Sequence, residues 1–569
     1  MALNKMKYNL NKRHYGAGED DHRYPWEMTN FKLISLTAVF LVAFDNFSFF
    51  RNVTTFYPAD LKNILFLFSL AVMLTCSIII LFSFFCFRYT TKPVLIIILL
   101  TSSVASYFMN NYNVVIDDTM IRNIIETNSS ESYDLLNYKL FVYLFFAGIL
   151  PSIFVYKIKI KYKSLLRELL LKITIIVCAL LIAVVSVFSL SDFYISFFRV
   201  NRILRFYSNP ACYVYSIFRC IADNFEGDRV EMKVIGADAR ISKTDTGREL
   251  IILVVGEAAR ADRFSLNGYQ RETNPLLKKE DIINFPDMNS CGTATAVSVP
   301  CMFSAFTRDE YSERKAESTY NILDILYRAG VNVLWRDNNS DSKGVALRVP
   351  YEDYRTPDNN TICDVECRDE GMLSGLQEYI ESRKTGDILI ILHQMGNHGP
   401  VYYKRYPGSF EKFKPVCKSN QLEQCTREEI NNAYDNAILY TDYFLSKVIG
   451  LLKRNPQFET AMFYLSDHGE SLGENNLYLH GLPYFMAPET QIHIPAVMWF
   501  GDGFEVDREM LKKNATGAYS QDNLFHTLLG LMEVKTTLYD GNLDILKGAV
   551  NHALTQKNDA AKSIVKLDN

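Results

Sequence analysis

The first third of the chain contains five apolar stretches, at residues 31–50, 64–87, 93–109, 140–157 and 169–190. Each approaches or reaches the roughly 20 residues that a helix needs to cross a bilayer. The preceding residues 1–30 are polar and lack the apolar core and cleavage site of a signal peptide. We therefore predict a polar tail over 1–30 and a transmembrane domain of five helices over 31–190.

The pattern changes after residue 190. Residues 191–248 mix aromatic and basic side chains, which is typical of helices lying in a membrane interface, and we predict bridging helices and a linker there. Beyond them, strand-like apolar runs lie at 250–255, 330–335, 387–393, 460–465 and 495–500. Amphipathic segments alternate with these runs, at 318–329, 372–383 and 430–453. This alternation predicts an α/β domain over 249–569 with a mostly parallel sheet covered by helices.

Basic residues predict the orientation of the apolar stretches. The tail is basic, and the loop after the fourth stretch is rich in lysine. The loop 110–138 instead holds one basic residue, Arg122, against five acidic residues. Because basic loops remain in the cytoplasm, the tail is predicted to be cytoplasmic. Five crossings then place everything after about residue 190 on the outer side of the membrane.

Composition and cysteine spacing agree with this topology. A hydrophobic content of 49% is high for a soluble protein, and a net charge of -4 against 60 basic and 64 acidic residues gives no indication of a nucleic-acid surface. Six of the eleven cysteines form close pairs in polar segments: Cys291 and Cys301, Cys363 and Cys367, and Cys417 and Cys425. Such pairs favour disulfides in an oxidising compartment. A second zinc site is the alternative, but only Cys363 and Cys367 approach zinc-ligand spacing.

The first cysteine pair encloses a candidate nucleophile. Residues 291–301 read CGTATAVSVPC, with hydroxyl side chains at Thr293, Thr295 and Ser298. Pro300 and the apolar run after it suit the first turn of a helix, whose free N–H groups attract phosphate. A threonine hydroxyl needs a metal or an adjacent base before it can attack phosphorus. Spacing does not decide between Thr293 and Thr295.

Two strand ends supply candidate metal ligands. Glu257 follows the strand-like run 250–256, and Asp467 and His468 follow the run 461–465. Ligands in α/β sheets gather beyond the carboxyl ends of strands, so these side chains can converge with Thr295. Two carboxylates, an imidazole and a hydroxyl oxygen make a tetrahedral zinc site. In the alternative interpretation, Asp467 caps a helix and His468 lies on the surface.

Several motifs together resemble those of the bacterial phosphoethanolamine transferases: VVGEAARADRFSLNGYQRETNP, SCGTATAVSVPCMFS, WRDNNSDSKG, GNHGP and YLSDHGESLGENNLYLHGLP. The resemblance covers most of the chain and is closest to the lipid A-modifying branch, which includes the mobilised colistin-resistance enzymes. It implies a bundle of five membrane helices carrying a periplasmic domain of the alkaline-phosphatase and sulfatase type. It also implies one or two zinc ions held by Glu257, Thr295, Asp467 and His468.

The resemblance assigns further roles. Aligned on the flanking cysteines, the nucleophile is Thr295, four residues after Cys291. Lys343 is placed at the substrate phosphate, where a cation offsets charge on the non-bridging oxygens, with Asn339 and Ser340 as hydrogen-bond donors beside it. Histidines in matched motifs, His398 and His480, are implied in proton transfer, in phosphate or head-group binding, or in binding a second metal.

The loop 110–138 carries a further candidate group. Asn123, Thr127 and Glu131 lie four residues apart and would share one face of a helix. Spacing alone favours an ordinary solvated face. The resemblance instead implies that these side chains hold the ethanolamine head group of the lipid substrate.

The activity implied by the resemblance is transfer of phosphoethanolamine from phosphatidylethanolamine to a phosphate of lipid A. The group would pass through a covalent intermediate on Thr295, with release of diacylglycerol and lower susceptibility to polymyxins. We expect a monomer in the bacterial inner membrane. The alternatives are a phosphoethanolamine or phosphoglycerol transferase with another acceptor, such as a core sugar or periplasmic glycan, a membrane-bound hydrolase of the same superfamily, and a membrane sensor with structural zinc.

Overall fold

The computed structural model of the protein describes residues 26–58, 60–127, 129–199, 202–227, 232–241 and 247–550. Most of the predicted tail, residues 1–25, lies outside these ranges. The chain divides into two compact units. The first comprises Met1–Ser106 and Phe141–Arg202, and the second comprises Tyr107–Leu140 and Ile203–Asn569. The segment 107–140 between two apolar stretches therefore belongs to the same unit as the α/β domain.

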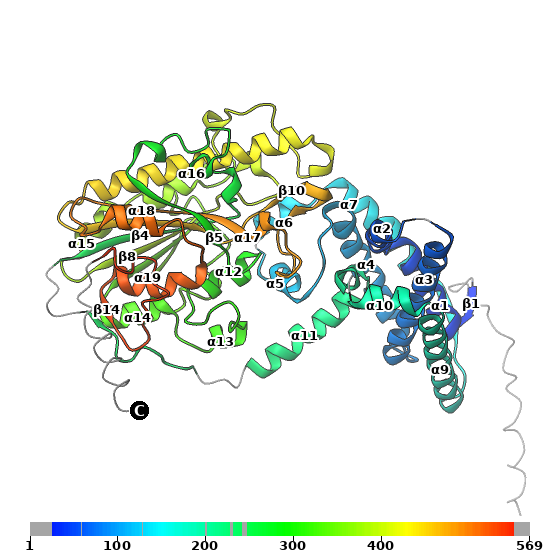
Figure 1. The fold of residues 1–569 in the computed structure, drawn as a ribbon. Helices are drawn as coiled ribbons and strands as arrows, with labels where there is room; N and C mark the ends of the chain where they lie inside the picture. The colour runs from blue at the N-terminus through cyan, green and yellow to red at the C-terminus, as the bar shows by residue number, and fades with distance from the viewer. Residues whose placement is uncertain are drawn as a thin grey trace, which may run out of the picture. The chain divides into compact units, whose positions relative to one another are not determined.

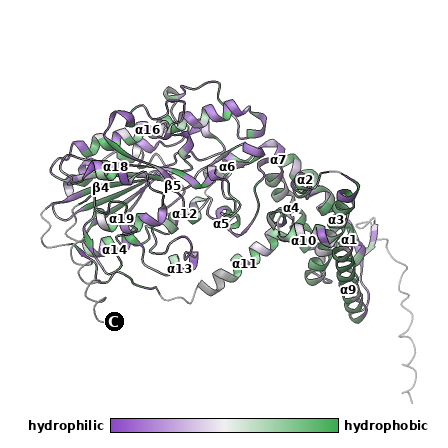
Figure 2. Ribbon diagram, viewed as in Figure 1, coloured by the Kyte–Doolittle hydropathy of each residue, from purple (hydrophilic) through white to green (hydrophobic). Residues whose placement is uncertain are grey.

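Long apolar helices occupy the predicted transmembrane region. Within the described residues, four helices are long and apolar enough to cross a membrane: Leu61–Phe85, Thr91–Tyr112, Tyr138–Lys157 and Leu166–Ser189. The first two are α3 and α4, the third combines α7, η1 and α8, and the fourth lies within α9 (Leu165–Ser189). Figure 2 shows the hydrophobic character of α3 and α9. These helices agree with four of the five predicted spans.

The remaining span differs from its prediction. Instead of one helix over 31–50, the chain forms α1 (Asn30–Phe44) and α2 (Phe47–Phe56), bent by 54° where they meet. The two count as a fifth span if the bent pair crosses as one. Asp45 and Asn46 interrupt the apolar run at the bend, and the Asn46 amide donates to the carbonyl oxygen of Leu41 at 2.9 Å. The same carbonyl oxygen accepts the N–H of Asp45 at 2.9 Å, so the last helical bond of α1 and the Asn46 side chain share it at the bend.

The region after the last apolar helix is helical where it is described. It contains α10 (Ser191–Arg199), η2 (Arg202–Tyr207) and α11 (Ala211–Gly227). Their placement in a membrane interface stays a prediction.

The second unit is built on a sheet of eight strands in the order β13-β5-β12-β9-β4-β8-β6-β7. The five predicted strands are present as β4 (Glu249–Gly256), β6 (Asn332–Asp337), β8 (Ile388–His393), β9 (Glu459–Ser466) and β12 (His493–Phe500). Three further strands extend the edges: β5 (Ile282–Asn289), β7 (Tyr351–Asp353) and β13 (Tyr519–Ser520). All pairings are parallel except those of β12 with β5 and β9. The predicted mostly parallel sheet is confirmed.

Helices cover both faces of this sheet, with α16 (Arg427–Lys453) on one side and α14 (Ile322–Ala329) and α19 (Leu524–Leu531) on the other (Figure 1). Residues of β4 alternate between the two cores, since Ile251 and Leu253 pack into one and Ile252 and Val254 into the other. A strand buried on both faces carries apolar residues at every position, which is the pattern that the sequence showed.

Three disulfides join the paired cysteines of the second unit. The predicted disulfides Cys291–Cys301, Cys363–Cys367 and Cys417–Cys425 are all formed.

The adjacent parallel strands β4 and β9 run in register, so that Gly256 pairs with Ser466. Their carboxyl ends therefore lie side by side, and the next residues of each strand, Glu257 and Asp467, become neighbours.

Candidate active site and metal centre

Four side chains meet beyond the ends of β4 and β9. His468 Nε2 lies 3.4 Å from Glu257 Oε1 and 3.4 Å from Asp467 Oδ2. Thr295 Oγ1 lies 3.3 Å from the same nitrogen and donates to Glu257 Oε2 at 3.0 Å. Glu257, Asp467 and His468 are fully buried, whereas Thr295 remains 8% exposed. Thr295 is thus the member of the group with some surface left open.

Backbone contacts aim these side chains at one another. Asp467 Oδ1 accepts from the N–H groups of Ala258 and His468, at 3.1 and 2.7 Å, which leaves Oδ2 turned toward the His468 ring. The ring's Nδ1 donates to the carbonyl oxygen of Gly469 at 2.8 Å. This bond fixes the tautomer and leaves Nε2 with a lone pair facing the carboxylates.

The arrangement fits a zinc ion. Glu257 Oε1 and Asp467 Oδ2 are buried oxygens that have no hydrogen-bond partner among the described residues, which is costly unless a cation accompanies them. With zinc bonds of about 2.0–2.1 Å, tetrahedral ligands lie roughly 3.3 Å apart, which matches the distances of 3.3–3.4 Å from His468 Nε2 to Thr295 Oγ1, Glu257 Oε1 and Asp467 Oδ2. Burial opposes charging of His468, but Asp467 and Glu257 outweigh it and raise the His468 pKa. The pocket therefore attracts positive charge.

Thr295, which carries the hydroxyl, is the first residue of α12 (Thr295–Met302). The helix begins at Thr295, so the predicted start at Pro300 is wrong, and Pro300 lies inside the helix. The first turn does not need a proline, since the N–H groups of Val297 and Ser298 donate to the Ala294 carbonyl oxygen at 3.0 and 2.8 Å. Thr293 turns away from the metal centre, where its hydroxyl donates to the carbonyl oxygen of Leu482 at 2.6 Å. Of the two threonines, only Thr295 faces Glu257.

Gln521 joins the two halves of the centre, and no local signal in the sequence predicted it. Its amide donates to the carbonyl oxygens of Ser466 and Asp467, each at 2.8 Å. Its own carbonyl oxygen accepts from the N–H of Cys291 and the hydroxyl of Ser298, each at 2.7 Å. The Gln521 side chain thus holds the segment with Cys291 and Ser298 against the end of β9.

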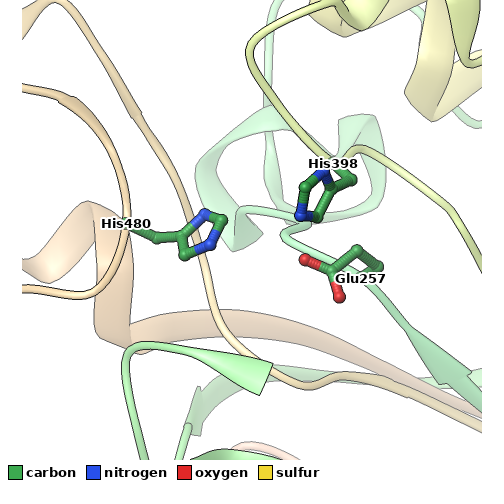
Figure 3. Close-up of side chains that lie close together, drawn as sticks. All are labelled: Glu257, His398 and His480. Carbon is green, nitrogen blue, oxygen red and sulfur yellow. The ribbon is translucent and has the colours of Figure 1, made fainter. Parts of the chain in front are cut away.

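His398 and His480 converge with Glu257 from separate segments (Figure 3). One ligand atom from each of the three residues lies within 4.8 Å of the others, and His468, Glu470 and His480 form a second such group. Glu470 Oε2 holds His480 Nδ1 at 2.7 Å, and Glu470 Oε1 accepts from the Tyr402 hydroxyl at 2.6 Å. Burial raises the pKa of Glu470 to about 8 and lowers that of His398 to about 4.

Glu470 was not among the predicted site residues. Its position inside the motif SDHGES, three residues after Asp467, is the signal that could have identified it. Its contact with His480 makes it the residue that orients that ring.

The loop after β6 carries the predicted phosphate-binding group. Asn339 is fully buried and its amide donates to Glu257 Oε2 at 2.8 Å and to the carbonyl oxygen of Gln394 at 2.7 Å. This places Asn339 as a support for the Glu257 carboxylate. Lys343 is 6% exposed at its side chain, with Nζ 3.2 Å from the Ser340 carbonyl oxygen and 3.6 Å from Glu126 Oε2. Lys343 and Ser340 also line a cavity of 490 Å³.

The segment 107–140 reaches the same neighbourhood. Asn123 lies in α5 (Asp118–Glu126), and a Cβ added at Gly481, next to His480, would lie 3.4 Å from its amide nitrogen. Thr127 ends the helix, and its hydroxyl donates to the Asn123 carbonyl oxygen. Glu131 lies in α6 (Ser129–Leu135), but its side chain is outside the described residues. The structure thus brings Asn123 close to the histidine group.

Comparison with known proteins identifies the family of this chain. Residues 249–534 match the sulfatase family, and residues 74–225 match the family described as phosphoethanolamine transferase EptA/EptB. Phosphoethanolamine transferase EptA of Escherichia coli strain K12 is 42% identical over 525 residues, which cover 90% of this chain and 95% of that protein. The chain belongs to the EptA/EptB phosphoethanolamine transferase family. Its predicted family is therefore confirmed.

Two further relatives support membership of this family. Phosphatidylethanolamine transferase Mcr-2 of Escherichia coli is 43% identical over 489 residues, covering 84% of this chain and 91% of that protein. Among solved structures, the integral membrane protein lipooligosaccharide phosphoethanolamine transferase A from Neisseria meningitidis matches with a TM-score of 0.89 and 34% identity. That match covers 92% of this chain and all of the other. The predicted fold class, an α-helical membrane region followed by an alkaline-phosphatase and sulfatase-like domain, is confirmed.

Proposed function

We propose that this family member transfers phosphoethanolamine from phosphatidylethanolamine to a phosphate of lipid A, through an intermediate on Thr295. The observation that carries the proposal is the contact of the Thr295 hydroxyl with Glu257 Oε2 at 3.0 Å and with His468 Nε2 at 3.3 Å, beside the buried Asp467. The names of the relatives supply the transferred group and, for a lipooligosaccharide enzyme, a closely similar acceptor. In this proposal the chain is a monomer of the bacterial inner membrane, with a cytoplasmic amino terminus and a periplasmic catalytic unit.

Glu257, Asp467, His468 and Thr295 would hold one zinc ion, and His398 and His480 are placed to help bind a second. When bound, zinc lowers the pKa of the Thr295 hydroxyl and neutralises charge on the substrate phosphate. The chain's own groups support the same chemistry, since Glu257 Oε2 already accepts the hydroxyl proton in the structure. Asn339 fixes the Glu257 carboxylate through its amide.

In the first step, Thr295 Oγ1 forms a bond to phosphorus as its proton passes to a neighbouring acceptor. The bond from phosphorus to the glycerol oxygen breaks, and that oxygen takes a proton from a ring nitrogen of His480 and leaves as diacylglycerol. In the second step, a lipid A phosphate oxygen attacks the phosphorus and the Thr295 oxygen regains its proton. Lys343 and Ser340 are placed to bind the phosphate oxygens, and Asn123, Thr127 and Glu131 the ethanolamine group.

Mass spectrometry of lipid A tests the proposal. A Gram-negative host expressing the wild type should gain a phosphoethanolamine-sized increment on lipid A, and a host expressing Thr295→Ala should not. Thr293→Ala is the matched control, because that hydroxyl contacts Leu482 and should be dispensable for chemistry. Unmodified lipid A with folded wild-type protein would exclude this acceptor, and release of free phosphoethanolamine would identify a hydrolase.

The added ammonium group offsets negative charge on lipid A and weakens its attraction for cationic peptides. We therefore expect lower polymyxin susceptibility in the same host. Unchanged susceptibility alongside confirmed lipid A modification would separate the enzymatic activity from this consequence.

A further inference from the structure

Arg405 joins three segments of the catalytic unit. Its side chain is 3% exposed and follows η7 (Tyr402–Lys404). Nε donates to the carbonyl oxygen of His398 at 2.6 Å, and Nη1 donates to Glu366 Oε2 at 2.5 Å. Nη2 donates to Asp134 Oδ2 at 3.2 Å. A buried guanidinium with three fixed partners is a rigid connection, because its planar fork holds each donor in a set direction.

Asp134 belongs to α6, in the segment 107–140 between the apolar helices Thr91–Tyr112 and Tyr138–Lys157. Its side chain is 11% exposed and also pairs with Lys404 Nζ. The Asn420 amide donates to the carbonyl oxygen of Asp134 at 2.7 Å, which fixes the backbone as well. The same segment carries α5 with Asn123, so its position against the catalytic unit bears on substrate binding.

The backbone at His398 has little room to absorb a displacement. A Cβ added at the next residue, Gly399, would lie 2.6 Å from Glu470 Oε1 and 2.8 Å from the Tyr402 hydroxyl. The His398 ring faces Glu257 and His480 (Figure 3). A shift of the His398 carbonyl oxygen is therefore passed to the ring, which would leave its place beside Glu257.

We propose that Arg405 and Asp134 are positioning residues that tie the segment 107–140 to His398 for the chemical step. This inference rests on the proposed function, in which His398 and Asn123 act on the same phosphoethanolamine group. Asp134 and Arg405 touch neither substrate nor metal. They set the distance between His398 and Asn123, the two groups proposed to act on the substrate. A misplacement of about 1 Å is enough to slow a reaction by up to about 100-fold.

Asp134→Asn tests the link, because it removes the charge while keeping the shape of the side chain. Lys404→Ala is the matched control, since it removes the other ion pair of Asp134 and leaves the Arg405 contacts with Asp134 and His398 intact. The full-length protein, in detergent with phosphatidylethanolamine and lipid A, gives kcat and KM. Intact mass gives the rate at which Thr295 gains phosphoethanolamine, and thermal unfolding gives stability.

We expect Asp134→Asn to lower kcat and the rate of Thr295 labelling by about tenfold or more. Its unfolding temperature should match that of Lys404→Ala, whose kcat should stay within about twofold of wild type. Asp134→Glu retains the charge and should recover most of the rate. Equal rates for Asp134→Asn and Lys404→Ala would overturn the proposal, and so would loss of folding in both Asp134→Asn and Asp134→Glu.

The labelling of Thr295 also separates two kinds of failure. If the wild type labels Thr295 but does not modify lipid A, the proposed acceptor fails, while the comparison of Asp134→Asn with Lys404→Ala still decides the positioning role. If the wild type does not label at all, the proposed intermediate fails. The two Asp134 variants are then compared by their turnover of phosphatidylethanolamine.

Discussion

Gln521 and Asp467 are linked by a hydrogen bond of 2.8 Å from the side-chain amide to the backbone carbonyl, across 54 residues of sequence. The carbonyl end of the same amide holds the N–H of Cys291 at 2.7 Å. The position of the Cys291 loop relative to Asp467, a proposed metal ligand, therefore depends on one buried side chain whose polar atoms are all engaged.

Replacing this amide should damage the metal centre before it damages the fold. Gln521→Glu keeps the size of the side chain but puts an oxygen against the carbonyl oxygens of Ser466 and Asp467. Each buried group left without a partner costs about 1–3 kcal/mol. We expect weaker zinc binding and at least about tenfold lower transfer, measured by metal titration and lipid A mass spectrometry. Zinc affinity equal to that of wild type would contradict this role.

Removing metal should lower stability as well as activity. Glu257 Oε1 and Asp467 Oδ2 are buried and have no hydrogen-bond partner in the described part of the chain, so zinc would offset their negative charge. A ligand present at 100 times its dissociation constant stabilises the folded state by about 2.7 kcal/mol. Chelation should therefore lower the unfolding temperature, and added zinc should restore it. Glu257→Gln provides the comparison, because its unfolding temperature should respond much less to zinc.

Gly396 should be intolerant of any side chain. It has a φ of +48°, and an added Cβ would lie 2.9 Å from the Glu257 carbonyl oxygen and 3.2 Å from its Cβ. Gly396→Ala should push Glu257 out of place and reduce transfer by about tenfold or more, because catalysis is sensitive to small displacements. The control is Gly450→Ala in α16, where an added Cβ meets no atom within 4 Å. That change should leave activity intact and stabilise the helix by up to about 1 kcal/mol.

Lys343 should matter for rate more than for folding. Its ammonium group lies 3.6 Å from Glu126 Oε2 and adjoins the cavity that Ser340 lines. If it binds the phosphate oxygens as proposed, Lys343→Ala should lower kcat/KM for transfer by about 100-fold, the size seen when one transition-state donor is removed. The exposed Lys315, which contacts the Glu310 carbonyl oxygen, supplies a control in Lys315→Ala. Equal effects of the two changes would exclude the phosphate role.

Much of the fold followed from local patterns. Continuous apolar runs identified the five central strands because a parallel strand is buried on both faces, as β4 is between its two cores. The short edge strands β7 and β13 have no such run and were not predicted. The bend between α1 and α2 was also missed, because overall hydropathy does not reveal that the Asn46 side chain joins the Asp45 N–H on the Leu41 carbonyl oxygen.

The sequence by itself determined the chemical types at the site, since Glu257, Asp467 and His468 each follow an apolar strand and Thr295 lies between paired cysteines. Only the tertiary structure decided their geometry. The register of β4 with β9 makes Glu257 and Asp467 neighbours, and the Leu482 carbonyl oxygen draws Thr293 away. Gln521 acts across 54 residues of sequence. Such long-range contacts leave no periodic or spacing signal, because each depends on how distant segments pack.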